Sequence, residues 1–254
     1  MNREQLIQAF EAYTSNYDLK NPNIYLKYVH TKKVAENCEC IAKSLHLSEE
    51  EIEIAWEIGM LHDIGRFEQL RRFDTFNDSI SIDHAQFGAD LLFKEGLIRN
   101  FDPEGKNDEL IEKAVRYHSL YRIPEGVSER ELLFCQIIRD ADKVDIYRAN
   151  YETGVHIVYH VTEAELRNST ITPEVYAVFC EKRAIPREIR KTVADSLVGH
   201  AALSFELVYP KSIELADQQG YLWKLLETEF DEPATAETMK CICETLKQWY
   251  EQKK

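Results

Sequence analysis

Residues 52–66 read IEIAWEIGMLHDIGR, an apolar segment that ends in a histidine followed by an aspartate. Its apolar residues recur at three- and four-residue intervals, which is the spacing of one face of an α-helix. Ser48 precedes the segment and Glu51 follows Ser48 by three residues, as in the capping box that opens many helices. The stretch therefore predicts a buried helix that opens after Ser48 and ends at His62 and Asp63.

Helical spacing continues along most of the chain, which has only 9 Gly and 7 Pro among 254 residues. Two polar, irregular stretches, residues 72–83 and 100–107, are expected to be loops, and no alternating pattern predicts a strand. The sequence therefore predicts an all-α protein. The further helices that we expect span residues 2–17, 23–46, 84–95, 107–118, 129–149, 173–183, 187–206, 209–218 and 233–252.

The composition is that of a globular protein with an acidic surface: 44% of the residues are hydrophobic, and the net charge is -14. An acidic surface argues against a nucleic-acid polymer or a membrane as partner, because both attract clustered Lys and Arg. No segment approaches the roughly 20 apolar residues of a membrane span. The first residues carry charges where an export signal is apolar, so we expect a cytoplasmic protein.

Six polar residues lie on apolar helical faces or at helix ends, where a core would normally be apolar. They are His30, His62, Asp63, His84, His118 and Asp142. A buried carboxylate without a partner costs several kcal/mol, and binding a cation is one of the few ways to remove that cost. A single such histidine is more often a hydrogen-bonded core residue. The whole set favours a site for a first-row transition metal.

Part of this set is similar to a known family. His30, the pair His62-Asp63 in GMLHDIGRFEQ, and Asp142 in RDADKVD resemble the HD superfamily of metal-dependent phosphohydrolases in order and in helical context. The dipeptide alone would be weak evidence, whereas the ordered set of residues is specific.

Two further histidines extend the resemblance. His84 in SIDHAQFGADLL and His118 in RYHSLYR are similar to the extra histidines of the two-metal subgroup of that superfamily. The resemblance covers roughly residues 20–150. It implies an HD-type helical bundle with an N-terminal helix over residues 1–150. Residues 151–254 are then expected to be a helical extension packed on this domain, with a lid as one role for it.

The resemblance also implies roles. His30, His62, Asp63 and Asp142 would hold one metal, and Asp63 would bridge to a second metal held by His84 and His118. Asp140 is the alternative to Asp142 as the last ligand of this set. We prefer Asp142 because it directly precedes Lys143, as in the family pattern. The metals would be one or two divalent ions, Fe, Mn, Zn, Ni or Co, with Mg left open.

Such a centre implies hydrolysis of a small phosphoester or phosphoanhydride, with a nucleotide as the first substrate class and nucleotidase or phosphodiesterase as the activity. A metal lowers the pKa of bound water from about 15.7 towards roughly 7, so that metal-bound hydroxide can attack phosphorus. Asp63 would take part directly, and Arg66 and Lys143 are candidate cations for the phosphate. For both cations, a solvated surface charge is the alternative.

Two other functions stay open. The same six residues resemble the di-iron centre of myo-inositol oxygenase and its relatives, which cleave carbon bonds with oxygen. The non-enzymatic hypothesis is a regulatory HD domain that a bound metal stabilises and that catalyses no reaction. The oligomeric state is undetermined from sequence, with a homodimer among the options.

Other histidines and aspartates have simpler interpretations. His156 and His160 are spaced as zinc ligands on a helix, but no third ligand is evident, so a surface or core pair is favoured. His200, in the apolar stretch LVGHAALSF, is expected to be a core residue. Asp83 would either orient an imidazole through its second ring nitrogen or cap the helix that begins at His84.

Overall fold

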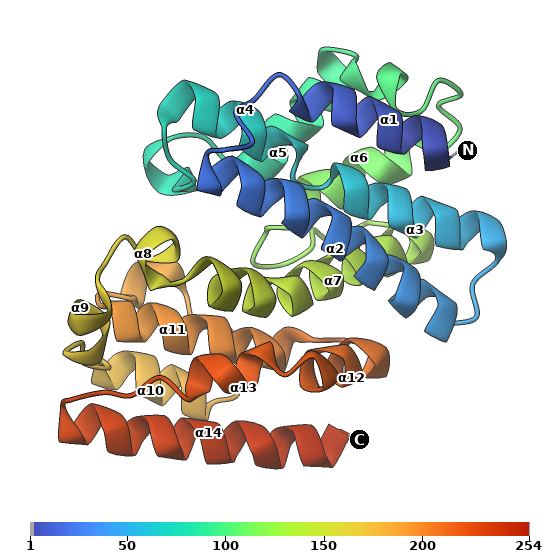
Figure 1. Cartoon of the computed structure of the whole chain (residues 1–254). Coiled ribbons are helices and arrows are strands. Elements are labelled where there is room, and N and C mark those ends of the chain that lie inside the picture. Colours follow the sequence, from blue (N-terminus) through green and yellow to red (C-terminus); the bar gives the residue numbers. More distant parts are fainter. Residues whose placement is uncertain (1–2, 254) are drawn as a thin grey trace. The chain divides into compact units, whose positions relative to one another are not determined.

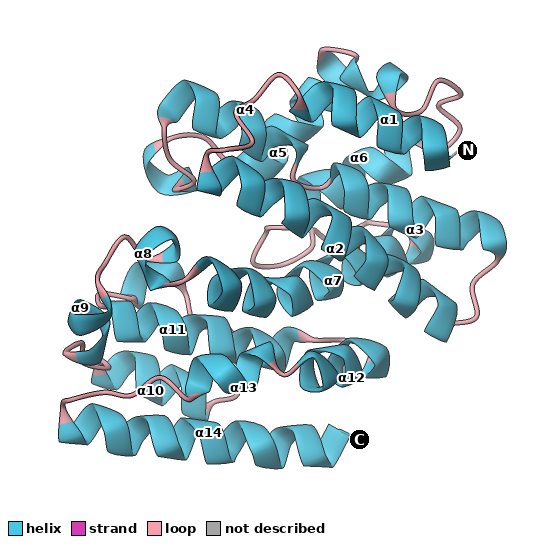
Figure 2. Cartoon of the chain, in the orientation of Figure 1, coloured by secondary structure: helices cyan, strands magenta, loops and turns pink. Residues whose placement is uncertain are grey.

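The computed structural model describes residues 3–253, which form helices joined by turns and contain no strand (Figure 2). The all-α prediction is confirmed. The chain divides into two compact units, Met1–Asp142 and Lys143–Lys254, coloured blue to green and yellow-green to red in Figure 1. Within the described residues no helix is long and apolar enough to cross a membrane.

The first unit contains six helices and the first part of a seventh. They are α1 Arg3–Thr14, α2 Pro22–Ser44, α3 Glu49–Leu61, α4 Ile64–Phe73, α5 His84–Ala89, α6 Asp108–Tyr117 and α7 Glu129–Thr153. Short 3-10 turns lie at Asp78–Ile80 and Leu97–Asn100, and a π-helical turn over Asp90–Lys94 extends α5. The predicted helix over 84–95 is therefore real but changes its hydrogen-bond pattern halfway.

Helices α2 and α3 pack along each other (Figure 1). Their backbones approach closely at Gly59, where a Cβ atom would lie only 2.5 Å from the Cα atom of Ala35. The side chain of Ser48 caps α3 and accepts a hydrogen bond from the backbone N–H of Glu51, so the predicted start of this helix is confirmed. This pairing brings His30, on α2, to the end of α3.

The predicted end of α3 is also confirmed, because the helix stops at Leu61 and Asp63 leaves helical geometry with φ -105° and ψ 16°. Helix α4, which begins immediately afterwards at Ile64, was not predicted from the sequence. Its buried face contains Arg66, Glu68 and Gln69 and is too polar for the apolar spacing that marks a helix.

Helices α4 and α5 approach each other through a pair of glycines. A Cβ atom on Gly65 would lie 2.5 Å from the backbone oxygen of His84 and 2.7 Å from the backbone nitrogen of Gly88. Side chains at these positions would push the helices apart. The contact thus sets the first residue of α5, His84, close to the α3–α4 junction.

The second unit has its own apolar core, which includes Val144, Val175, Leu197 and Ile242. Its helices are α8 Val155–Val158, α9 Glu163–Arg167, α10 Pro173–Cys180, α11 Val193–Ala201, α12 Pro210–Gln219, α13 Tyr221–Leu226 and α14 Pro233–Lys253. Helix α14 packs on α12 and α13, and α11 packs on α10 and α13 (Figure 1).

The single helix predicted over residues 187–206 is wrong. This segment forms a 3-10 turn at Arg187–Ile189, then α11, then a 3-10 turn at Ala202–Glu206. The break occurs because Thr192 caps α11 in a reciprocal capping box with Asp195, so a new helix starts there. Apolar spacing continues across such a cap and does not reveal it.

The boundary between the compact units falls within α7, whereas the predicted domain boundary lies at residue 150. Helix α7 runs without interruption to Thr153, so no loop marks the change from one core to the other. Asp142 is the last residue of the first unit.

Candidate metal centre

All six predicted ligands belong to the first unit, and they come from five places in its fold. His30 lies in α2, His62 and Asp63 form the α3–α4 junction, His84 opens α5, His118 follows α6 and Asp142 lies in α7. The four histidines and Asp63 are at most 4% exposed. Residues that are far apart in sequence thus converge around one buried carboxylate.

Asp63 lies between two pairs of histidines, and each of its oxygens faces one pair. Its Oδ2 atom is 3.6 Å from Nε2 of His30 and 3.7 Å from Nε2 of His62. Its Oδ1 atom is 3.5 Å from Nε2 of His84 and 3.8 Å from Nε2 of His118. Two three-residue groups able to hold a metal ion therefore share Asp63.

Asp142 joins the pair formed by His30 and His62. Its Oδ1 atom lies 3.0 Å from Nε2 of His30 and 3.9 Å from Nε2 of His62. Burial alone would raise the pKa of Asp142, but His30 and His62 outweigh burial and hold it well below its usual range. Asp140, the rival, is fully buried on the same helix.

Hydrogen bonds to the other ring nitrogen orient three of the histidines. The Nδ1 atom of His62 donates to the carbonyl of Gly59 at 2.8 Å, and that of His118 donates to the carbonyl of Val115 at 2.7 Å. The Nδ1 atom of His84 donates to Oδ2 of Asp78 at 2.7 Å. A neutral imidazole with its proton on Nδ1 has a lone pair on Nε2, so these three rings present acceptors to the centre.

The arrangement fits metal ions. The Nε2 atom of His62 is buried and has no hydrogen-bond partner. The Nε2 atoms of His84 and His118 lie 3.1 Å apart, so two lone pairs face each other unless a cation or a proton lies between them. Neutral imidazoles and carboxylates suit divalent transition metals, and partners on the second ring nitrogen are typical of metal-ligating histidines.

The comparison with protein families agrees with this geometry. The family model described as the HD domain matches residues 28–147. The chain contains an HD domain. HD domains form a superfamily of metal-dependent phosphohydrolases, and the matched segment contains all six predicted ligands. No curated protein and no solved structure matches the chain.

The charge state of this HD domain suits ligation. Burial lowers the pKa of His62 to about 4 and that of His84 to about 3, so both rings are neutral at pH 7. Burial would raise the pKa of Asp63, but the positive charges beside it, Lys27 first and also Arg66, hold its pKa well below the usual range and keep this carboxyl ionised. The centre therefore offers neutral nitrogen donors and charged oxygen donors together.

Of the two predicted phosphate-binding cations, Arg66 lies beside the centre. Its Nε atom is 3.7 Å from Oδ1 of Asp63, is buried and has no hydrogen-bond partner. Its Nη1 atom donates to the backbone carbonyl of Phe76 and to Oδ1 of Asp78, so part of the guanidinium holds the loop after α4. Lys143 directly follows Asp142, is the first residue of the second unit and is buried.

Two residues near the centre were not predicted from the sequence. Lys27 lies one turn before His30 on α2, and its Nζ atom is 2.7 Å from Oδ2 of Asp63. Asp78, in the loop after α4, pairs with both His84 and Arg66. Helical spacing from His30 could have indicated Lys27, whereas no local pattern marks Asp78.

Asp83 caps α5 and accepts hydrogen bonds from the backbone N–H groups of Ala85 and Gln86. The orienting partner of His84 is Asp78 instead. His156 and His160 are both exposed, and α8 ends before His160, whose φ is 57°, so the two do not face one another along a helix.

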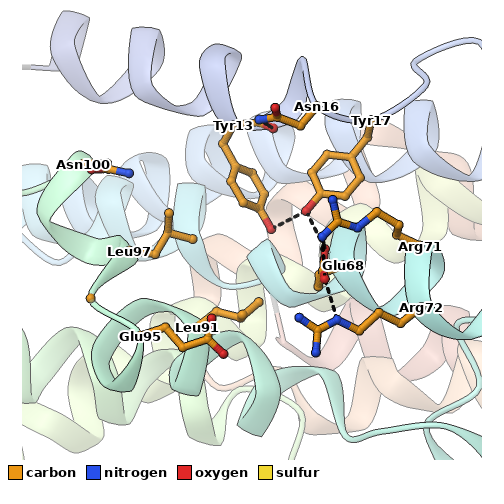
Figure 3. A pocket seen from close by; sticks show the side chains of 11 residues that line it. Tyr13, Asn16, Tyr17, Glu68, Arg71, Arg72, Leu91, Glu95, Leu97 and Asn100 are labelled. Atoms are coloured by element: carbon orange, nitrogen blue, oxygen red, sulfur yellow. Dashed lines mark hydrogen bonds and ion pairs between the residues drawn. The ribbon is translucent and has the colours of Figure 1, made fainter.

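A separate groove of about 500 Å³ lies in the first unit beside α4 (Figure 3). Arg71 and Arg72 line this groove, and both are ion-paired with Glu68. The hydroxyl of Tyr17 also donates to Glu68. The lining contains none of the six predicted metal ligands, so these two arginines belong to a different surface.

Proposed function

We propose that the HD domain hydrolyses a phosphoester or phosphoanhydride bond of a small molecule, with nucleotides as the first substrate class. The single observation that carries the proposal is the position of Asp63, whose two oxygens face two separate pairs of imidazole nitrogens 3.5–3.8 Å away. A carboxylate shared in this way is typical of two-metal hydrolytic sites.

His30, His62, Asp63 and Asp142 would hold one metal, and Asp63, His84 and His118 the other. Bound divalent metals would supply a nucleophile at neutral pH by lowering the pKa of coordinated water, and they would offset the charge of a phosphoryl group. Fe, Mn, Co, Ni and Zn all suit this donor set.

The protein's own cations complete the proposal. The side chain of Lys27 is 17% exposed, so its ammonium lies at the solvent edge of a carboxylate that is itself buried. The ring of Phe76 lies 5.6 Å from the ammonium of Lys27 and 5.6 Å from the guanidinium carbon of Arg66. Two cations on one edge of the centre suit a phosphate group, which a guanidinium or an ammonium binds by charge-assisted hydrogen bonds.

The test is phosphate release from a panel of nucleotides and an aryl phosphate by protein that has been stripped with a chelator and reloaded with one metal at a time. We expect release to depend on the added metal and to be lost in His62→Ala and in Asp63→Ala. His156→Ala, which removes an exposed histidine of the second unit, is the matched control and should retain activity.

Full activity of His62→Ala would refute the site assignment. Substrate-dependent oxygen uptake by the iron-loaded protein without phosphate release would instead identify a di-iron oxygenase. Tight metal binding without turnover of any substrate in the panel would leave the regulatory role as the better account.

A further inference from the structure

The second unit contains a polar cluster that the proposed hydrolysis does not use. It is built around His200 on α11, whose Nδ1 atom is 2.8 Å from Nδ2 of Asn150 and 2.9 Å from the hydroxyl of Tyr159. The rings of Tyr159 and His200 stack with their centroids 5.7 Å apart. Two residues from different segments thus converge on one ring nitrogen of His200.

Two donor groups of this cluster compete for one ring nitrogen. A ring nitrogen either accepts one hydrogen bond or donates one, so Nδ1 of His200 cannot satisfy both the Asn150 amide and the Tyr159 hydroxyl. Burial, with Arg190 and Arg187 nearby, lowers the pKa of His200 to about 3, so the ring is neutral at pH 7. A donor of Asn150 or Tyr159 is therefore left over for another acceptor.

Arg190 lies beside this cluster and is held in place by the backbone. Its Nε and Nη2 atoms both donate to the carbonyl of Ile185. The guanidinium also packs on Gly199, the residue before His200, where a Cβ atom would lie 2.4 Å from the guanidinium carbon. Only glycine leaves room for this contact, so the fold positions a cation next to the ring of His200.

The charge of Arg190 is not balanced by a close acid. Among the described residues, no carboxylate forms an ion pair with Arg190 or Arg187. Glu188 and Asp195 act on Arg190 only from longer range, and the carboxylate of Asp195 accepts backbone hydrogen bonds at the start of α11. Burial and Arg187 lower the pKa of Arg190 to about 10, which still leaves it charged at neutral pH.

We propose that Arg190, together with Tyr159, Asn150 and His200, forms a binding site for a tetrahedral oxyanion, namely phosphate, either free or as the terminal phosphoryl group of a small molecule. The N–H groups of the Arg190 guanidinium that do not bond the carbonyl of Ile185 can donate to the oxygens of such an anion, and the surplus donor of the cluster supplies a further hydrogen bond. Arg187 adds a second positive charge, which favours a doubly charged phosphate over a carboxylate. The site lies wholly in the second unit and does not rest on the proposed hydrolytic function.

The experiment uses the full chain with His62→Ala, stripped of metal by a chelator, so that no bound metal holds phosphate at the metal centre. Binding of inorganic phosphate and of a nucleoside monophosphate is measured by calorimetry. We expect Arg190→Met to weaken binding by about 10-fold or more, because a charge-assisted hydrogen bond is lost. Arg183→Met removes an arginine of the same unit whose side chain is 41% exposed and paired with Glu181, and this variant should bind as the parent does.

Gly199→Ala is the second variant, because it keeps every charge and displaces the guanidinium; thermal unfolding shows whether each variant is folded. Gly199→Ala should weaken phosphate binding as Arg190→Met does. Equal affinity for the two ligands would indicate free phosphate, and tighter nucleotide binding would indicate a phosphoryl group of a larger molecule. Unchanged affinity in folded Arg190→Met or Gly199→Ala, or no saturable binding by the parent, would overturn the proposal.

Discussion

The Nε2 atoms of His84 and His118 face each other at a distance of 3.1 Å in the buried interior of the first unit. Both rings donate their Nδ1 proton elsewhere, to Asp78 and to the carbonyl of Val115, so the facing atoms are both acceptors. Two lone pairs at this distance repel unless a proton or a metal cation lies between them. A divalent metal bound by both atoms would remove this repulsion.

Divalent metal should stabilise the protein. Because metal binds the folded centre and not the separated ligands of the unfolded chain, a metal concentration 100 times Kd adds about 2.7 kcal/mol to the free energy of unfolding. For a chain of this size that corresponds to roughly 5–10 °C in Tm. Thermal unfolding with chelator and with added Mn or Fe measures the shift. His118→Ala should reduce metal content from two ions per chain to one, and an unchanged stoichiometry would contradict the assignment.

Asp78→Asn should weaken metal binding and turnover by roughly 10- to 100-fold, because Asp78 accepts the Nδ1 proton of His84 and also pairs with Arg66. Metal affinity and phosphate release are the two readouts. Asp74→Asn is the control in the same loop, since Asp74 has a φ of 52° that asparagine also tolerates. If both variants behave alike, the effect belongs to the loop and not to the imidazole.

Lys27→Met should lower kcat/KM for phosphate release by roughly 10- to 100-fold while metal content stays near that of the parent, because Lys27 supplies a charge for the substrate and is not a metal ligand. Steady-state kinetics and metal analysis of one preparation give both values. Lys33→Met removes an exposed lysine of the same helix, paired with Glu36, and should leave the kinetics unchanged. If Lys27→Met loses bound metal as well as activity, Lys27 supports the structure of the metal centre instead of binding the substrate.

Glu57 offers a pH test away from the centre. It is 2% exposed, and burial, with Asp102 nearby, raises its pKa to about 8. The folded state therefore holds a proton that the unfolded chain releases near pH 4.5, so the stability from this group is lost as pH rises towards 8. Glu57→Gln should raise the free energy of unfolding by roughly 2 kcal/mol at about pH 8.5 and change it little at about pH 5. Denaturant unfolding of the parent and of Glu57→Gln at the two pH values measures this difference. An equal change in the free energy of unfolding at both pH values would show that Glu57 is ionised throughout.

The sequence by itself determined the helical class of this protein and the identity of the residues that converge. Apolar spacing predicts α2, α3, α6 and α7 because each of them buries one continuous stripe. Helix α4 was missed because its buried positions include Arg66 and Gln69, whose partners come from the loop after it. The break in the helix predicted over residues 187–206 was not predicted for a related reason. A capping box starts a new helix there without interrupting the apolar pattern.

Only the tertiary structure decided how the other five residues divide around Asp63 and which carboxylate supports His84. Asp83 is adjacent to His84 in sequence but is used to cap α5, while Asp78, six residues away, reaches the imidazole. The glycine contact between α4 and α5 sets that geometry through close packing of backbones. Local sequence encodes the period of a helix, whereas the partner of a buried polar group depends on which segments the fold brings together.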